Sequence, residues 1–221
     1  MVYNLASKIK DALTNPNKAI KYLALGKEEY ETLQNLTNHS CTSGISVKTP
    51  LERRMTVPTD IHEHLSVLHM LTVEFNLKNI LELGTRTGES TIALLQAAKE
   101  IDGFVTSIDI DSCNDAKKKI NEYSLGEKWK FIQSDDLEIN WKDKIDHLFI
   151  DTSHTYEQTL SELKKFGSFV RPGGIISLHD IISHKQVFEA IEEYLKIRND
   201  LKFYKFFHNN GLGIIKVTNT T

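Results

Sequence analysis

Residues 79–95, NILELGTRTGESTIALL, decide the fold of this chain. The stretch begins with a short apolar run, turns at Gly84 to Gly88, and continues with apolar residues at helical spacing. A strand that passes through a glycine-rich turn into a helix is a unit of open α/β sheets, in which ligands bind beyond the carboxyl ends of the strands. The turn is therefore a candidate ligand-binding loop, with a purely structural turn as the alternative.

The rest of the chain repeats this alternation of strand and helix. Strands are predicted at 79–83, 104–109, 130–133, 145–151 and 174–179, and helices at 61–75, 90–99, 114–123, 156–169 and 186–198. Such alternation predicts a parallel sheet covered on both faces. The last two apolar runs, LKFYKFF and GLGIIKV, flank the turn sequence HNNG and predict an antiparallel hairpin. The predicted fold is a doubly wound α/β sheet of seven strands, mostly parallel, closed by this hairpin.

The first 58 residues have a different character. They are polar and rich in Lys and Asn, with three helical patches before residue 40 and a connector over 41–58. We expect a helical N-terminal extension or lid at 1–58 and a cofactor-binding domain at 59–221. The extension would close over a substrate or pair two subunits, so a homo-oligomer is possible.

Composition restricts the class of protein. The net charge of −3 gives no reason to expect a nucleic-acid partner. No apolar stretch has the length of a membrane helix, no signal peptide follows Met1, and two cysteines are too few for a disulfide framework. The expected location is the cytoplasm, without a membrane partner.

The loop sequence does not suit a phosphate-bearing ligand. A dinucleotide fingerprint needs a glycine where this loop has Arg86, and no Gly-Lys-Ser/Thr of a P-loop is present. Glu82 would repel a pyrophosphate but suits a cationic ligand. Asp109 follows Gly88 by 21 residues and ends the next strand, where an acid can bind a ribose diol. Asp109 could instead cap a helix, and Ser134 and Asp135, which could meet an adenine edge, could instead form a turn.

These residues carry a family resemblance. Glu82-Leu83-Gly84-x-x-x-Gly88, Asp109 and Ser134-Asp135 resemble the cofactor motifs of class I S-adenosylmethionine-dependent methyltransferases, over about residues 55–217. The nearest branches are the metal-dependent O-methyltransferases of the catechol and caffeoyl-CoA type and the macrocin O-methyltransferase and cephalosporin-hydroxylase-like group. The resemblance implies a Rossmann-like methyltransferase fold. It also implies cofactor contacts at the sugar (Glu82, Asp109), the methionine end (Gly84, Ser90) and adenine (Ser134, Asp135), with Thr85 and Gly88 as further cofactor-binding residues of the loop.

A second group of candidates follows the fourth and fifth strands. Asp151 ends one strand and His179-Asp180 ends the other, so both ends open on the same crevice. The metal-dependent families carry acidic or amide ligands here, which implies a divalent cation (Mg or Mn) held by Asp151, His179 and Asp180. Histidine departs from that pattern and favours Mn²⁺, Fe²⁺ or Zn²⁺ over Mg²⁺.

His154, three residues after Asp151, is the candidate general base. With an ordinary pKa near 6.5 it could accept a proton without much tuning, so a rate that falls below pH 6 to 7 is expected. The alternative is a helix cap at Asp151 followed by a surface histidine. His62, His64 and His184 are expected to be surface histidines.

The predicted function is a cytoplasmic O-methyltransferase that uses S-adenosylmethionine and divalent-metal assistance. Its acceptor would be a hydroxyl of a small molecule, with a sugar or glycosylated metabolite preferred. Two alternatives stay open: a non-catalytic S-adenosylmethionine-binding module, and an NAD-dependent oxidoreductase, which Arg86 and the terminal hairpin disfavour.

Overall fold

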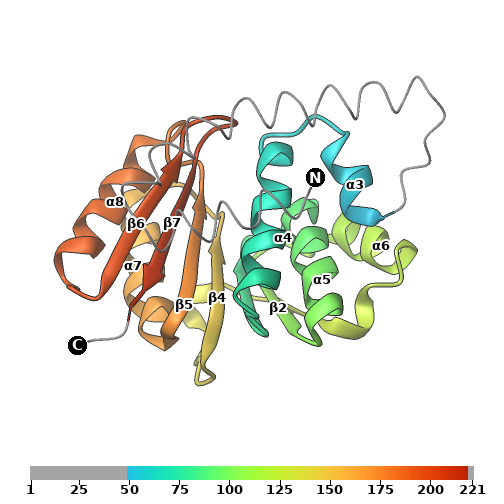
Figure 1. Cartoon of the computed structure of the whole chain (residues 1–221), viewed down its shortest axis with the longest axis horizontal. Coiled ribbons are helices and arrows are strands. Elements are labelled where there is room, and N and C mark those ends of the chain that lie inside the picture. Colours follow the sequence, from blue (N-terminus) through green and yellow to red (C-terminus); the bar gives the residue numbers. More distant parts are fainter. Residues whose placement is uncertain (1–48, 219–221) are drawn as a thin grey trace.

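The computed structural model of the chain describes residues 49–218, which form one seven-stranded sheet in the order β3-β2-β1-β4-β5-β7-β6 (Figure 1). The strands are β1 (Asn79–Leu83), β2 (Phe104–Asp109), β3 (Trp129–Gln133), β4 (Ile145–Ile150), β5 (Val170–His179), β6 (Leu201–Phe206) and β7 (Leu212–Val217). The first five are parallel, and β7 is antiparallel to both β5 and β6. The predicted doubly wound sheet and its antiparallel hairpin are confirmed. A dinucleotide-binding sheet would instead have a parallel sixth strand.

Helices cover both faces of the sheet, as Figure 1 shows. They are α3 (Pro50–Met55), α4 (Leu65–Glu74), α5 (Glu89–Ile101), α6 (Asn114–Glu122), α7 (Tyr156–Phe166) and α8 (Lys185–Lys196). Helices α4 and α5 pack together over one face, and α7 and α8 pack together over the other. Each pair encloses a separate apolar core, and all six residues of β4 between the two cores are buried.

Strand register brings the candidate residues to one edge of the sheet. Leu83 of β1 is paired with Ile108 of β2 and with Ile150 of β4, and Ile150 is paired with Leu178 of β5. The residues that follow these four positions, Gly84, Asp109, Asp151 and His179, therefore lie side by side at the carboxyl edge. This convergence depends on the pairing of strands far apart in sequence.

Several element boundaries differ from the prediction. The expected connector contains α3, which a capping box between Thr49 and Glu52 starts and which buries Leu51 in the core. The helix predicted from residue 61 begins at Leu65, after a 3₁₀ turn over His62–His64. The helices predicted before residue 40 lie outside the described residues.

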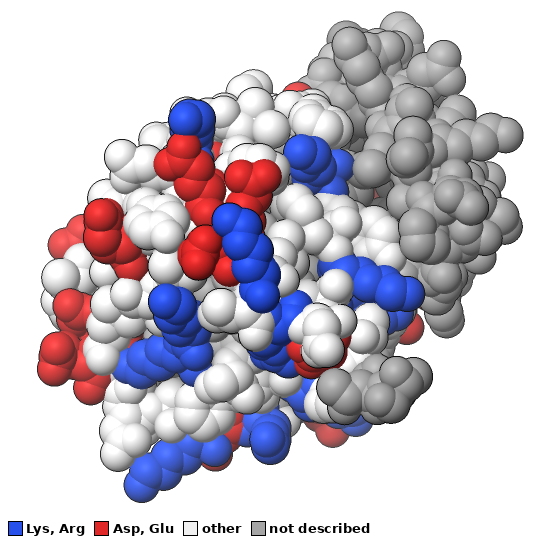
Figure 2. All heavy atoms as spheres, turned by 90° about the vertical axis from the view of Figure 1, so that its left-hand side faces the viewer, with Lys and Arg blue, Asp and Glu red and all other residues white. Residues whose placement is uncertain are grey.

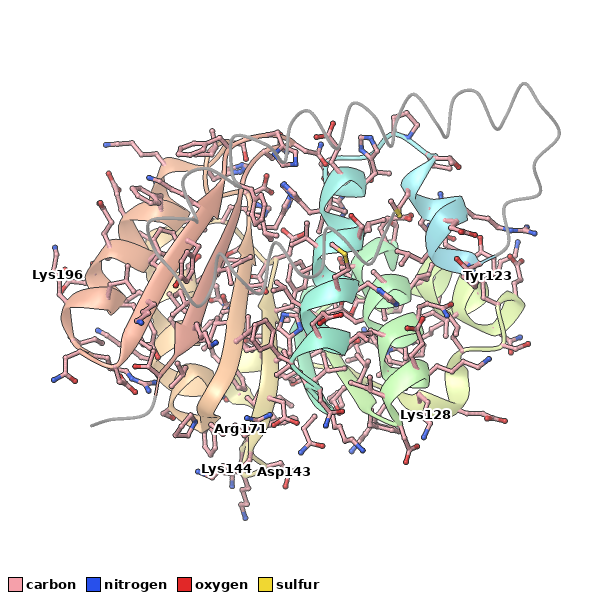
Figure 3. All side chains as sticks on the ribbon, in the orientation of Figure 1. Tyr123, Lys128, Asp143, Lys144, Arg171 and Lys196 are labelled. Atoms are coloured by element: carbon pink, nitrogen blue, oxygen red, sulfur yellow. The ribbon has the colours of Figure 1, made fainter. Side chains whose placement is uncertain are left out.

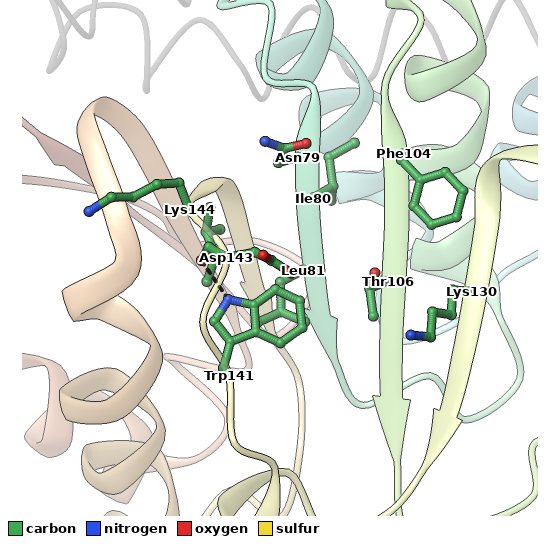
Figure 4. A pocket seen from close by; sticks show the side chains of 10 residues that line it. Asn79, Ile80, Leu81, Phe104, Thr106, Lys130, Trp141, Asp143 and Lys144 are labelled. Carbon is green, nitrogen blue, oxygen red and sulfur yellow. Dashed lines mark hydrogen bonds between the residues drawn. The ribbon is translucent and has the colours of Figure 1, made fainter.

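No α-helix joins β3 to β4; a 3₁₀ turn at Asp136–Glu138 takes its place. This leaves a cavity of about 440 Å³ on the sheet, with Trp141 on one side and Phe104 on the other (Figure 4). The Trp141 indole is fixed by a hydrogen bond from Nε1 to the carbonyl oxygen of Asp143, 2.8 Å long. Asp143 and Lys144 lie at the periphery, below the sheet in Figure 3. None of the predicted site residues lines this cavity.

The surface that carries β6 and α8 mixes basic and acidic side chains (Figure 2). Among residues 49–218, no helix has both the length and the apolar character needed to cross a membrane.

Candidate active site

Both glycines of the loop after β1 are required by close packing. Gly84 and Gly88 have φ angles of +86° and +83°, which side chains of L-residues rarely adopt. A Cβ at Gly84 would lie 1.9 Å from the carbonyl oxygen of Asp151, and a Cβ at Gly88 would lie 2.8 Å from Cβ of Ala116. The loop therefore lies directly against the end of β4 and the start of α6.

We expect Gly84→Ala to destabilise the fold by at least about 2 kcal/mol, since both the left-handed backbone and the contact with Asp151 must give way. Urea unfolding measures this difference. Gly126→Ala is the matched control, because Gly126 has nothing within 4 Å of an added Cβ and no positive φ. Equal unfolding midpoints for the two variants would contradict the packing argument.

Asp109, the predicted ribose ligand, also holds the loop. Its Oδ2 accepts hydrogen bonds from the backbone N–H groups of Thr85 at 2.7 Å and Arg86 at 2.9 Å, and its Oδ1 accepts one from Asp111 at 2.8 Å. Burial would raise the pKa of this carboxyl, but the three N–H groups outweigh burial and lower it. Asp109 is thus an ionised carboxylate at the cavity edge.

Glu82 is enclosed beneath the loop and does not line the cavity. Its carboxylate accepts hydrogen bonds from the hydroxyls of Ser90 at 2.7 Å, Thr91 at 2.8 Å and Ser107 at 2.5 Å. Burial raises its pKa to about 7, although these hydroxyls oppose the shift. These hydrogen bonds connect Glu82 of β1 with Ser90 and Thr91 of α5 and with Ser107 of β2, beneath the loop. The direct sugar contact expected of Glu82 and the methionine contact expected of Ser90 are not what this geometry favours.

A cavity of about 380 Å³ opens over the carboxyl ends of β1, β2 and β3. It is lined by Gly84, Arg86, Ile108, Asp109, Ile110, Asp111, Ser134, Asp135, Asp136, Asp151, Thr152, Ser153 and Gln158. Ser134 and Asp135 line the cavity, and Asp135 also forms a turn by accepting from the Leu137 N–H. Ile110, whose side chain is 70% exposed beside Asp109, also lines the cavity, although it was not among the predicted site residues. An apolar residue directly after an acidic strand end was the available signal.

The predicted metal ligands and base converge at the ends of β4 and β5. His154 Nε2 lies 3.0 Å from Asp151 Oδ1 and 2.9 Å from Asp180 Oδ2. His179 Nδ1 lies 3.6 Å from Asp151 and 3.5 Å from Asp180. We call these four residues the acid–histidine cluster. His154 and Asp180 have φ angles of 59° and 61°, a strained conformation that concentrates at functional sites.

The electrostatics of the cluster differ from the prediction. Hydrogen bonds to Asp151 and Asp180 raise the pKa of His154 to about 9, where an unperturbed value near 6.5 was expected. Burial alone would lower the pKa of His179, but the same two carboxylates raise it. Burial likewise opposes ionisation of Asp180, yet the histidines and Ser183 lower its pKa. With no cation present, His154 is therefore protonated at neutral pH and cannot accept a proton.

The three histidines that were expected at the surface have different environments. His64 is fully buried and His62 is 8% exposed, so the expectation that both are surface residues is wrong. His64 packs against His179 with ring centroids 5.7 Å apart, because the turn before α4 folds over the end of β5. His184 is partly exposed, as expected, but its ring stacks on His154 at 4.3 Å.

The donor atoms of the cluster could hold a divalent cation. Asp151, His179 and Asp180 each offer a ligand atom within 4.8 Å of the others, and His154, Asp180 and His184 form a second, overlapping group. His179 Nδ1 is buried and makes no hydrogen bond of normal length, so it could bind a cation once its proton is displaced. Two carboxylates and an imidazole suit Mn²⁺, Fe²⁺ or Zn²⁺ better than Mg²⁺.

Part of the chain matches a known protein family. Residues 81–181 match a family model described as a methyltransferase domain. No curated protein sequence matches the chain significantly.

Several solved structures share the fold. A provisionally assigned caffeoyl-CoA O-methyltransferase from Staphylococcus aureus is 19% identical, with 85% of this chain and 98% of that chain covered and a TM-score of 0.68. The O-methyltransferase TomG from Streptomyces achromogenes, in complex with SAM, is 16% identical over 80% and 94% of the two chains, with a TM-score of 0.62. An O-methyltransferase from Bacillus cereus in complex with SAH is 17% identical over 86% and 100%, with a TM-score of 0.62. These structures confirm the predicted methyltransferase fold, and the family match at residues 81–181 agrees with the predicted resemblance to class I S-adenosylmethionine-dependent methyltransferases.

Proposed function

We propose that this chain, which carries a methyltransferase domain at residues 81–181, transfers a methyl group from S-adenosylmethionine to a hydroxyl of a small molecule. The observation that carries this proposal is the position of Asp151, which belongs both to the wall of the 380 Å³ cavity and to the acid–histidine cluster. A methyl donor in the cavity and a hydroxyl at the cluster would therefore meet at the end of β4.

The cavity residues fit the adenosyl part of the cofactor. Asp109 offers an ionised carboxylate to the ribose hydroxyls, and Ile110 offers an apolar surface to the adenine ring. Ser134 and Asp135 border the same region. Glu82 contributes indirectly, because its hydrogen bonds hold the start of α5 against β2. Structures of related fold contain SAM or SAH, which supports this choice of cofactor.

Asp151, His179 and Asp180 would hold a divalent cation, which supplies Lewis acidity to an acceptor hydroxyl. The same carboxylates hold the proton of His154, so the positive charge of a cation there would lower the pKa of His154. His154 Nε2 would then be free to accept the hydroxyl proton. The preferred acceptor is a sugar or a glycosylated metabolite.

The proposed function is tested by calorimetry and by S-adenosylhomocysteine release. Purified protein should bind S-adenosylmethionine. Release of S-adenosylhomocysteine in the presence of a panel of hydroxylated acceptors should stop with EDTA and return with Mn²⁺. Cofactor binding without turnover of any acceptor would favour a non-catalytic binding module. Binding of NAD instead would favour an oxidoreductase.

We expect Asp109→Ala to weaken S-adenosylmethionine binding by about 1.5–3 kcal/mol, the range for hydrogen bonds to a charged group. The loss combines the ribose contact with looser anchoring of the Thr85 and Arg86 N–H groups. Asp109→Asn separates the two contributions, since an amide oxygen can still accept from the loop but carries no charge. Calorimetry that finds unchanged affinity in Asp109→Ala would remove the ribose role.

A further inference from the structure

Arg86 has a position that neither the adenosyl contacts nor the acid–histidine cluster explains. It lies in the middle of the loop after β1 with a φ of 46°, and its N–H donates to Asp109 at 2.9 Å. The backbone from which the side chain starts is therefore fixed. The side chain itself is 65% exposed.

The guanidinium is held from one side only. Its Nη2 lies 2.6 Å from Oδ2 of Asp60, a residue of the segment that leads into the His62–His64 turn. An exposed ion pair of this kind contributes at most about 1 kcal/mol to stability, so a gain in stability does not explain why Arg86 and Asp60 are paired. Within residues 49–218 the guanidinium makes no further side-chain hydrogen bond, which leaves most of its five N–H donors for a ligand.

Arg86 also lies where the two halves of the site meet. It lines the cavity together with Asp151. Asp60 has the largest effect in raising the pKa of Arg86, and the charges of Asp151 and Asp180 raise it further. A molecule whose hydroxyl reaches the acid–histidine cluster would thus present its remaining atoms to a permanently charged guanidinium.

We propose that Arg86 binds an anionic group of the methyl acceptor, so that the enzyme acts on hydroxyls of acidic small molecules. This inference rests on the proposed function. Asp60 holds the guanidinium at Nη2. The planar group can still offer two parallel N–H groups to a carboxylate, a geometry that lysine cannot reproduce. The cofactor also carries a carboxylate, and the experiment separates these two sources of the anion.

The test uses matched probes with and without a carboxylate: methyl glucuronide against methyl glucoside, and 3,4-dihydroxybenzoate against catechol. Calorimetry is done on the full chain with S-adenosylhomocysteine and Mn²⁺ present. In at least one pair the wild type should bind the acid at least about tenfold more tightly than its neutral partner, the strength of a charge-assisted hydrogen bond. Arg86→Gln should remove this preference, and Arg86→Lys should keep part of it.

Arg53→Gln is the matched control, because Arg53 is exposed on α3 and lines neither the cavity nor the cluster. It should keep the full preference for the acid. Equal binding within every pair, no binding of any probe, or a preference that survives in Arg86→Gln would overturn the inference. A tenfold loss of S-adenosylmethionine affinity in Arg86→Gln would assign the anion to the cofactor instead. A wild type that binds no S-adenosylmethionine would refute the proposed function itself, and this inference with it.

Discussion

Asp180→Asn should lower kcat by about 10³-fold, a loss of roughly 4 kcal/mol in transition-state stabilisation, while S-adenosylmethionine affinity changes by no more than a few-fold. Asp180 contacts His154 and Ser183 but does not line the cofactor cavity. The amide keeps the shape of the side chain and removes the charge that a cation requires. Asp180→Asn should therefore reduce turnover and the amount of metal bound per chain. The cofactor affinity measured by calorimetry should stay close to that of the wild type.

Asp143→Ala provides the control for this experiment, since Asp143 lines the 440 Å³ cavity at the opposite end of the sheet. It should retain both turnover and metal. If Asp180→Asn keeps the wild-type rate, or if the wild type is insensitive to EDTA and contains no metal, Asp180 and Asp151 have no role in cation binding. The acid–histidine cluster would then be a set of buried ion pairs.

Much of the fold follows from local patterns in the sequence. Apolar runs locate the strands closely, and β1 and β2 match their predicted bounds, with Gly84 directly after β1 and Gly103 directly before β2. The start of α4 was missed because Ile61, His62 and His64 are buried by distant elements. Glu63 N–H donates to Asn209 Oδ1 across 146 positions, a contact that no local pattern encodes.

The candidate site was predictable in its members but not in its chemistry. Asp151, His154, His179 and Asp180 follow strand ends, and parallel pairing brings strand ends together. The sequence could not show that both carboxylates lie on the same nitrogen of His154, which raises its pKa to about 9. The burial of Glu82 and the pair between Arg86 and Asp60 likewise depend on how the loop folds over β1.

His154→Ala should lower kcat by roughly 10²–10⁴, the usual contribution of a general base, with the cation still bound. The pH dependence gives a second readout, because a base acts only when deprotonated. Without a cation the pKa of His154 is about 9. A cation on the same carboxylates repels the imidazole proton, so the rising limb of the metal-loaded enzyme should lie below pH 9. It should vanish in His154→Ala.

NMR titration of the histidine rings tests the same coupling without a known acceptor. The His154 resonance should titrate near pH 9 in EDTA and at lower pH with Zn²⁺. His69, which is paired with Glu100 at 3.0 Å, serves as the control, and addition of the cation should not shift its ring resonances. Because His154 shares its proton with the two proposed metal ligands, a base role requires this response. A His154 pKa that stays near 9 with the cation bound would leave His154 as a positioning partner of Asp151 and Asp180 and exclude it as the base.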